Sequence, residues 1–185
     1  MGLFDFLKSK PKPEIKTAQK ITTTDNIKQL IDLTVCEEDA MKLKAFLGDK
    51  IKNSSEEEPL PDESMEFNSQ EIVDFMAEKP VCFYGFFDWK EYSSEFDIYV
   101  RNAMKRNFGL EITKEKICDL YELTTIDKVY KLYEAELEKQ QITLCNIDIG
   151  SDSYQIILVK NEYYEKLFAP VKKLGFKIEH FSEEW

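Results

Sequence analysis

Apolar residues recur at helical spacing near the start of the chain and predict two short helices. Thr24 or Asp25 would cap the first helix. Its apolar stripe is Ile27, Leu30, Ile31 and Val35. Thr34 and Glu37 have the spacing of a capping box, which would open the second helix. Together these helices form a predicted N-terminal helical unit over residues 21–52.

Short apolar runs of strand length appear later in the chain. They predict strands near residues 81–87, 142–149, 154–159 and 176–181. Gly85 lies inside the first run and indicates either a bulge or close packing. The polar residues 150–153 separate the second and third runs, a pattern typical of a β-hairpin. At least part of the sheet is therefore expected to be antiparallel.

Helical patterns fill the space between the predicted strands. The helices are expected to begin at Ser93 or Ser94, at Thr113, at Thr124 and at Asn161. The order is then strand, three helices, hairpin, helix and strand. This order predicts an α+β fold with a small sheet packed against helices.

Composition divides the chain into four parts. Residues 1–20 form a basic segment with a net charge of +3, which we interpret as a mobile tail that is dispensable for folding. Residues 53–67 are rich in acidic residues and contain two prolines, which indicates a solvated linker after the helical unit 21–52. Residues 68–185 form the predicted main α+β domain. Membrane contact through residues 1–20 is the less favoured interpretation of the tail.

Charge and cysteine content restrict the environment and the partners. The chain has 36 acidic and 25 basic residues, with a net charge of −11, which argues against nucleic-acid binding and favours a basic protein partner. Its four cysteines are isolated from one another and no apolar run is long enough to span a bilayer. These features predict a cytoplasmic protein with reduced thiols.

The single histidine, His180, weakens several classes of enzyme. Serine and cysteine triads use an imidazole base, and most zinc sites draw on several His or Cys ligands. The sequence also contains no phosphate-binding loop and no dinucleotide fingerprint. We expect His180, beside Glu179, to be a packed or surface residue, and we predict no cofactor and no metal.

Two short segments contain candidate binding residues. The first follows the first predicted strand and contains Asp88, Trp89 and Lys90, with Trp89 as a flat contact surface. The second surrounds the hairpin turn and contains Asp148, Ser151, Asp152 and Tyr154. The two aspartates could hold a hard cation, but Asp and Ser are also ordinary turn residues. Trp89 could equally cap the core.

The same two segments resemble a family of small bacterial proteins described as a domain of unknown function. The resemblance rests on Asp88-Trp89-Lys90 after an apolar strand and on Gly150-Ser151-Asp152-Ser153-Tyr154 before another. It covers about residues 70–181 and implies a bacterial cytosolic α+β protein. In its acidic and compact character, the chain is also similar to immunity proteins that neutralise basic toxin domains.

Two functional hypotheses follow from these observations. The favoured one is a non-enzymatic, acidic protein-interaction domain, with an immunity-type inhibitor as one form. The alternative is a hydrolase or transferase that uses carboxylates with Mg²⁺ or Ca²⁺ near Asp148 and Asp152. Convergence of Asp88, Trp89, Asp148 and Asp152 in one concave pocket would favour the enzyme, and a broad acidic face would favour the partner.

Overall fold

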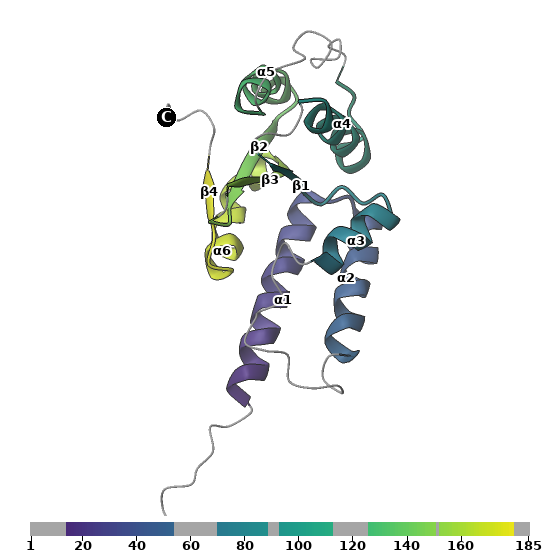
Figure 1. Ribbon diagram of the computed structural model, residues 1–185, viewed down its shortest axis with the longest axis vertical. Helices are drawn as coiled ribbons and strands as arrows, with labels where there is room; N and C mark the ends of the chain where they lie inside the picture. The colour runs from purple at the N-terminus through teal and green to yellow at the C-terminus, as the bar shows by residue number, and fades with distance from the viewer. Residues whose placement is uncertain (1–13, 54–69, 89–92, 113–125, 151, 180–185) are drawn as a thin grey trace, which may run out of the picture.

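The computed structural model describes residues 14–53, 70–88, 93–112, 126–150 and 152–179, and it confirms the α+β class (Figure 1). Its strands form one antiparallel sheet with the order β1-β3-β2-β4. They are β1 (Gly85–Asp88), β2 (Ile142–Asp148), β3 (Ser153–Lys160) and β4 (Lys177–Glu179). The helices are α1 (Glu14–Thr34), α2 (Glu37–Asn53), α3 (Gln70–Glu78), α4 (Ser93–Ala103), α5 (Ile126–Lys139) and α6 (Tyr164–Lys173), with a π-helical turn η1 (Met104–Phe108) and a 3₁₀ turn η3 (Asn161–Tyr163). Within the described part, no helix combines the length and apolar character that spanning a bilayer requires.

The β2–β3 hairpin is the centre of the sheet, and it confirms the predicted pairing across the polar turn. The register joins Ile142 to Lys160 and Asn146 to Ile156. Gly150 in the turn has a φ of 75°, which glycine adopts without steric cost. Adjacent strand residues point to opposite faces, and both faces of this hairpin are buried. The hairpin therefore needs a helical layer on each side.

Helices α1, α2, α3 and α6 share one buried cluster with one face of the hairpin; α1 contacts β3, and α2 packs beside α1 (Figure 1). Strands β2 and β3 point Cys145, Ile147, Ile157 and Val159 into this layer. The buried apolar residues of α1, α2 and the link between them are Ile27, Leu30, Ile31, Val35, Ala40, Leu43 and Leu47. One cluster of buried side chains thus joins the helices predicted for the N-terminal unit to the sheet of the predicted main domain.

Helices α4 and α5 cover the other face of the hairpin. Strands β2 and β3 point Ile142, Leu144, Ile156 and Leu158 into this layer. Asp97 of α4 is buried there, and its carboxylate accepts hydrogen bonds from the Tyr133 hydroxyl and from Arg101 Nε at 3.0 Å. These bonds stabilise a charge that would otherwise be costly to bury, and they join α4 to α5.

Helix α1 begins ten residues before the predicted cap, so the predicted start at Thr24 or Asp25 is wrong. Residues 14–25 contain no glycine or proline that would interrupt a helix, and Pro13 directly precedes Glu14. Thr24 is buried within the helix. The last seven residues of the predicted tail 1–20 are therefore helical, and residues 1–13 lie outside the described part.

The predicted capping box between α1 and α2 is also wrong. The Thr34 hydroxyl donates to the Leu30 carbonyl at 2.8 Å, so it bonds back into α1 and does not cap α2. Helix α2 instead begins with three acidic residues, Glu37, Glu38 and Asp39. Negative charges in a first turn interact favourably with the helix dipole.

Strand β1 begins at Gly85 and not at residue 81, as predicted. The preceding residues Val81, Phe83 and Tyr84 are buried without being part of the strand. A Cβ atom at Gly85 would lie 2.4 Å from the Phe87 ring and 2.8 Å from the Tyr99 ring. Close packing, one of the two expectations for Gly85, is therefore the reason for this glycine.

Some predicted elements fall outside the described residues. The helix expected from Thr113 and the linker after residue 53 belong to segments 113–125 and 54–69. The last predicted strand, 176–181, is described as β4 only over Lys177–Glu179, and His180 lies beyond it.

A buried ion pair connects α2 to the π-helical turn η1, 67 residues further along the chain. Arg106 Nη2 donates to Asp39 Oδ1 at 2.8 Å, and Arg106 Nε donates to the other carboxylate oxygen. The Asp39 side chain is fully buried, whereas the Arg106 side chain is 35% exposed. Hydrogen bonding from Arg106 holds the pKa of Asp39 below its ordinary value, against the opposing effect of burial.

Substitution of Gly85 by alanine is expected to destabilise the protein by about 1–3 kcal/mol, because the added methyl group has no space beside Phe87 and Tyr99. Gly48→Ala is the matched control. Gly48 lies inside α2 with nothing within 4 Å of an added Cβ, so alanine should stabilise by about 0.5–1 kcal/mol. Urea unfolding of both variants measures the difference. Equal effects at the two sites would contradict the close packing at Gly85.

Asp39→Asn is expected to lower the free energy of unfolding at pH 7 by about 2 kcal/mol, because a charged hydrogen bond is lost while Arg106 stays partly hydrated. The folded-state pKa of Asp39 is depressed, so its contribution is present at neutral pH and is lost as the pH falls below about 4. Urea unfolding between pH 3 and 7 should show the two proteins converging at the acidic end. The control is Asp32→Asn, which removes an exposed pair with Lys44 and should change stability by less than about 0.5 kcal/mol.

Candidate functional site

The sheet places the two predicted candidate segments side by side. Asp88, the last residue of β1, is the cross-strand partner of Ser153, the first residue of β3. Asp152 immediately precedes Ser153, and Asp148 ends β2 on the other side of the turn. Three carboxylates therefore gather at one end of the sheet. We call this region the turn end.

The candidate residues at the turn end have different environments. Asp88 and Asp152 are exposed. Asp148 accepts a hydrogen bond from the Gly150 backbone N–H at 2.8 Å, the usual role of an aspartate in a turn. Tyr154 is half-buried and packs against the α4–α5 layer. Of the other candidates, Trp89, Lys90 and Ser151 lie outside the described residues.

The described residues offer no ligand set for a metal ion. They contain no group of three or more His, Cys, Asp or Glu side chains that could hold one. At the turn end, Asp148 is the cross-strand partner of Lys177 in β4, which places a cation in the register beside that carboxylate. The carboxylates of the turn end are thus arranged as surface charges.

Phe86 adds an apolar surface to the turn end that the sequence pattern did not single out. It lies in the apolar run that predicted the first strand, and 48% of it is exposed. Residues two apart share a face of a strand, so Phe86 and Asp88 lie on the same side of β1. The buried Phe87 lies on the opposite side, with the α4–α5 layer. The one sequence signal for this exposure is that side chains along a strand point to alternate faces, so that Phe86 and Phe87 cannot share a face.

A buried polar side chain lies directly across from Phe86. Gln155 of β3 is fully buried, and both atoms of its side-chain amide lack a hydrogen-bond partner among the described residues. Its backbone N–H donates to Asn146 Oδ1 at 3.0 Å, where β2 and β3 begin to separate. Unpaired buried polar groups are rare in folded proteins and cost stability.

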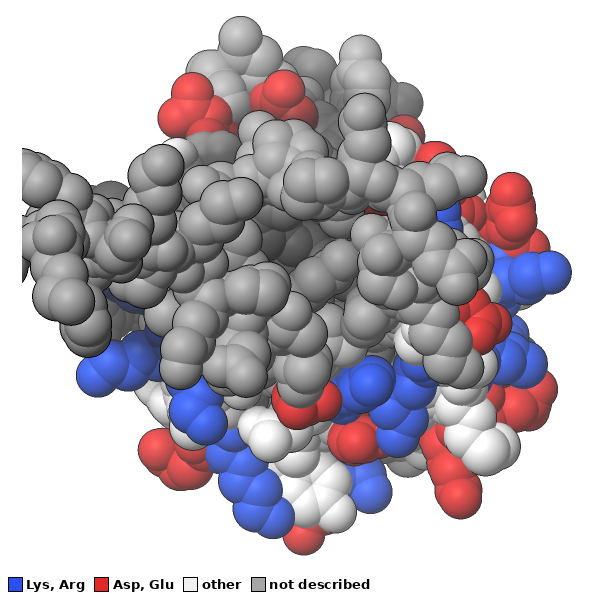
Figure 2. Space-filling view, turned by 90° about the horizontal axis from the view of Figure 1, so that it is seen from below, with Lys and Arg blue, Asp and Glu red and all other residues white. Residues whose placement is uncertain are grey.

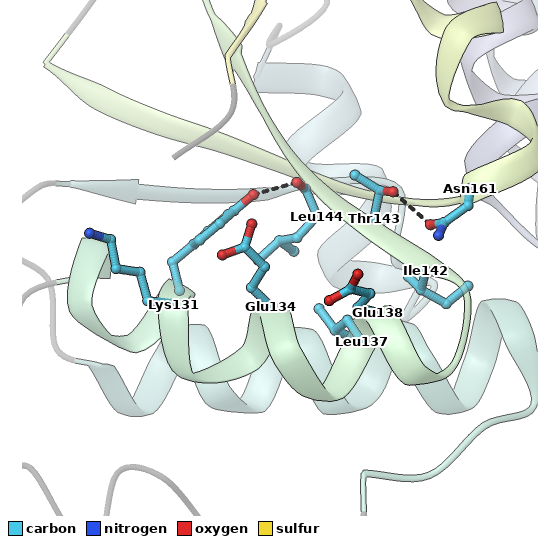
Figure 3. A pocket seen from close by; sticks show the side chains of 9 residues that line it. Lys131, Glu134, Leu137, Glu138, Ile142, Thr143, Leu144 and Asn161 are labelled. Carbon is cyan, nitrogen blue, oxygen red and sulfur yellow. Dashed lines mark hydrogen bonds between the residues drawn. The ribbon is translucent and has the colours of Figure 1, made fainter. Parts of the chain in front are cut away.

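A second candidate region is a hollow of about 340 Å³ between α5 and the start of β2, at the opposite end of the hairpin from the turn (Figure 3). Leu137 of α5 and Ile142 and Leu144 of β2 provide its apolar lining. The carboxylates of Glu134 and Glu138, one turn apart on α5, point from the helix towards β2 (Figure 3).

The polar wall of the hollow is internally hydrogen bonded. The Thr143 hydroxyl donates to Asn161 Oδ1 at 2.7 Å, and the Tyr130 hydroxyl donates to the Leu144 carbonyl (Figure 3). The sequence analysis did not identify this region. Glu134 and Glu138 are two of 36 acidic residues, and the sequence alone gives no reason to select them.

The net negative charge is unevenly divided along the chain. The described residues carry −4 and the remaining residues −7, which together give −11. Residues 54–69 alone contribute −6. On the face seen from below in Figure 2, acidic and basic side chains of the described residues alternate around its rim. The described surface on that side is therefore mixed in sign.

Replacement of Gln155 by methionine, which has a similar shape and no amide, is expected to raise the free energy of unfolding by about 1 kcal/mol or more. Asn146→Leu is the informative counterpart, because it leaves the Gln155 backbone N–H without its acceptor and should destabilise by about 1–3 kcal/mol. Thermal and urea unfolding measure both changes. A destabilising Gln155→Met would show that the amide has partners.

Comparison with known proteins identifies the family of this chain. No curated protein and no solved structure matches this chain. A family model described as a domain of unknown function matches residues 18–181, which extends the predicted resemblance over 70–181 to include most of α1 and all of α2. The chain therefore belongs to that family, DUF6630.

Proposed function

We propose that this protein is a non-enzymatic interaction domain that binds a basic protein partner, with an immunity-type inhibitor as one form. One observation carries the proposal: the β1–β3 register brings exposed carboxylates and the exposed Phe86 to one end of the sheet. Protein interfaces commonly combine aromatic anchors at their centre with a polar, solvent-accessible rim. Trp89 follows Asp88 directly in the sequence and belongs to the same proposed contact.

The arrangement at the turn end supports binding more than catalysis. A carboxylate-based enzyme needs its groups in a concave site, often around a metal ion. Asp88 and Asp152 are exposed, Asp148 is used in the turn, and the hollow lies at the other end of the hairpin. The described residues also provide no metal-ligand group. These features support contact with a partner at the turn end more than a concave catalytic site.

The charge distribution supports a two-part mode of recognition. Long-range attraction of a basic partner would come from the net charge of −11, most of which belongs to residues outside the described part. Short-range contact would come from Phe86 and its acidic neighbours at the turn end. The proposal also places the protein in the bacterial cytoplasm, in keeping with the free thiols of Cys36, Cys82 and Cys145.

The test begins with the full chain as bait in an extract of its native cell, eluted at low and high salt and analysed by mass spectrometry. Association of the purified partner is then measured with Asp88→Asn and Asp152→Asn, each expected to slow association about two- to five-fold at low salt. The difference should vanish at about 1 M salt, where charges are screened. Phe86→Ala should instead speed dissociation about ten-fold.

Glu165→Gln is the matched control, because Glu165 is an exposed carboxylate on α6, away from the turn end. This variant should associate at nearly the wild-type rate. A complex insensitive to salt, or equal effects of Glu165→Gln and Asp88→Asn, would contradict the proposed surface. Turnover of a small molecule by the purified protein would contradict the non-enzymatic function.

A further inference from the structure

The hollow between α5 and β2 contains two carboxylates that no described cation neutralises. Glu136 on the same helix pairs with Lys139 at 3.2 Å. Neither Glu134 nor Glu138 forms such a pair, although both line the hollow. Like charges one helical turn apart repel each other, so a bound cation would relieve a local cost. Glu138 is exposed and Glu134 half-buried, so both carboxylates are accessible to a ligand from solvent.

The hydrogen bonding of the wall determines which polar groups of the lining can meet a ligand. The Tyr130 hydroxyl proton is directed to the Leu144 carbonyl, and the Thr143 hydroxyl proton to Asn161 Oδ1. With these donors committed, the two carboxylates offer oxygen lone pairs to a ligand, and the Asn161 amide NH₂ and the Lys131 ammonium are donors of the lining. A positively charged donor group fits the part of the hollow that holds the two carboxylates.

The shape and the lining add a second requirement. The volume of about 340 Å³ is at the lower end of the range for small-molecule sites. Leu137, Ile142 and Leu144 provide an apolar surface beside the carboxylates. Methylene groups can lie on such a surface while a charged head remains at the polar rim, as lysine side chains do on protein surfaces.

We propose that this hollow binds an aliphatic ammonium group: a chain of several methylenes that ends in –NH₃⁺. Glu134 and Glu138 bind the ammonium, and the apolar residues of α5 and β2 contact the chain. A free diamine or polyamine and the lysine side chain of a bound polypeptide share this chemistry. The site is separate from the turn end, so the proposal does not depend on the proposed function.

Lys131 is the one described cation among the lining residues, and it provides a further test. Its ammonium group lies at one end of the hollow, away from the two carboxylates (Figure 3). It would still repel a bound cation through the partly open site. Replacing Lys131 by methionine keeps the length of the side chain and removes this repulsion. The variant should bind an ammonium ligand more tightly than the wild type does.

The experiment titrates the full chain with 1,5-diaminopentane, spermidine and a blocked lysine peptide, followed by the amide NMR signals of residues 134–144 and 161. Glu134→Gln and Glu138→Gln should each weaken binding about five-fold, the change expected for a partly exposed charged contact. Lys131→Met should strengthen it, and Glu165→Gln should leave it unchanged. Tighter binding of the free amines would identify a small-molecule site, and tighter binding of the peptide a lysine-binding site.

Two ligand controls separate specific binding from general screening. 1,5-Pentanediol has the same chain without charge and should not bind, and KCl at equal ionic strength should not reproduce the shifts. Thermal unfolding establishes that the glutamine variants are folded. The proposal is overturned if no amine shifts these signals, if KCl shifts them equally, or if Glu134→Gln and Glu138→Gln behave like Glu165→Gln.

Discussion

Burial of the β2–β3 hairpin on both faces is the constraint from which the rest of the architecture follows. Alternate residues of the two strands enter different layers, so neither layer alone can remove the hairpin from water. Helices α4 and α5 are close in sequence to the hairpin and cover one face. The other face is covered by elements from both ends of the described chain, which is why α1 and α6 lie against each other (Figure 1). The pair between Asp39 and Arg106 then links the two groups of helices.

The sequence predicted those features that depend on neighbouring residues. The hairpin, the helix after Ser93 and the stripe around Leu30 are local patterns, and the structure confirms them. The predicted start of α1 was wrong because threonine is a common capping residue, whereas Thr24 lies inside the helix. The turn end and the ion pair between α2 and η1 instead depend on contacts between distant segments. Asp88 meets Ser153, and Asp39 meets Arg106, through registers that no local pattern contains.

The two ends of the hairpin differ in a way that gives the molecule two separate surfaces. At the turn end, exposed carboxylates and the exposed Phe86 lie close together on the sheet, which suits contact with another macromolecule. At the other end, the carboxylates of α5 face a hollow with an apolar lining. Both regions are built on strands β2 and β3, so the hairpin holds the two regions in a constant position relative to each other. The side-chain amide of Gln155, buried across from Phe86, lacks a hydrogen-bond partner among the described residues. The free energy of unfolding is therefore below the value that a better-matched residue at this position would give.

The packing of α1 against α6 also determines when the protein can fold during synthesis. Helices α1 and α2 leave the ribosome long before residues 142–171, which complete their apolar layer. At a translation rate of about 5–20 residues per second, their stripes stay uncovered for several seconds. The nascent chain must remain free of aggregation through that interval, when its N-terminal helices have only each other, α3 and the residues just before β1 to cover them. Its numerous charged residues, 33% of the chain, keep this early intermediate hydrated.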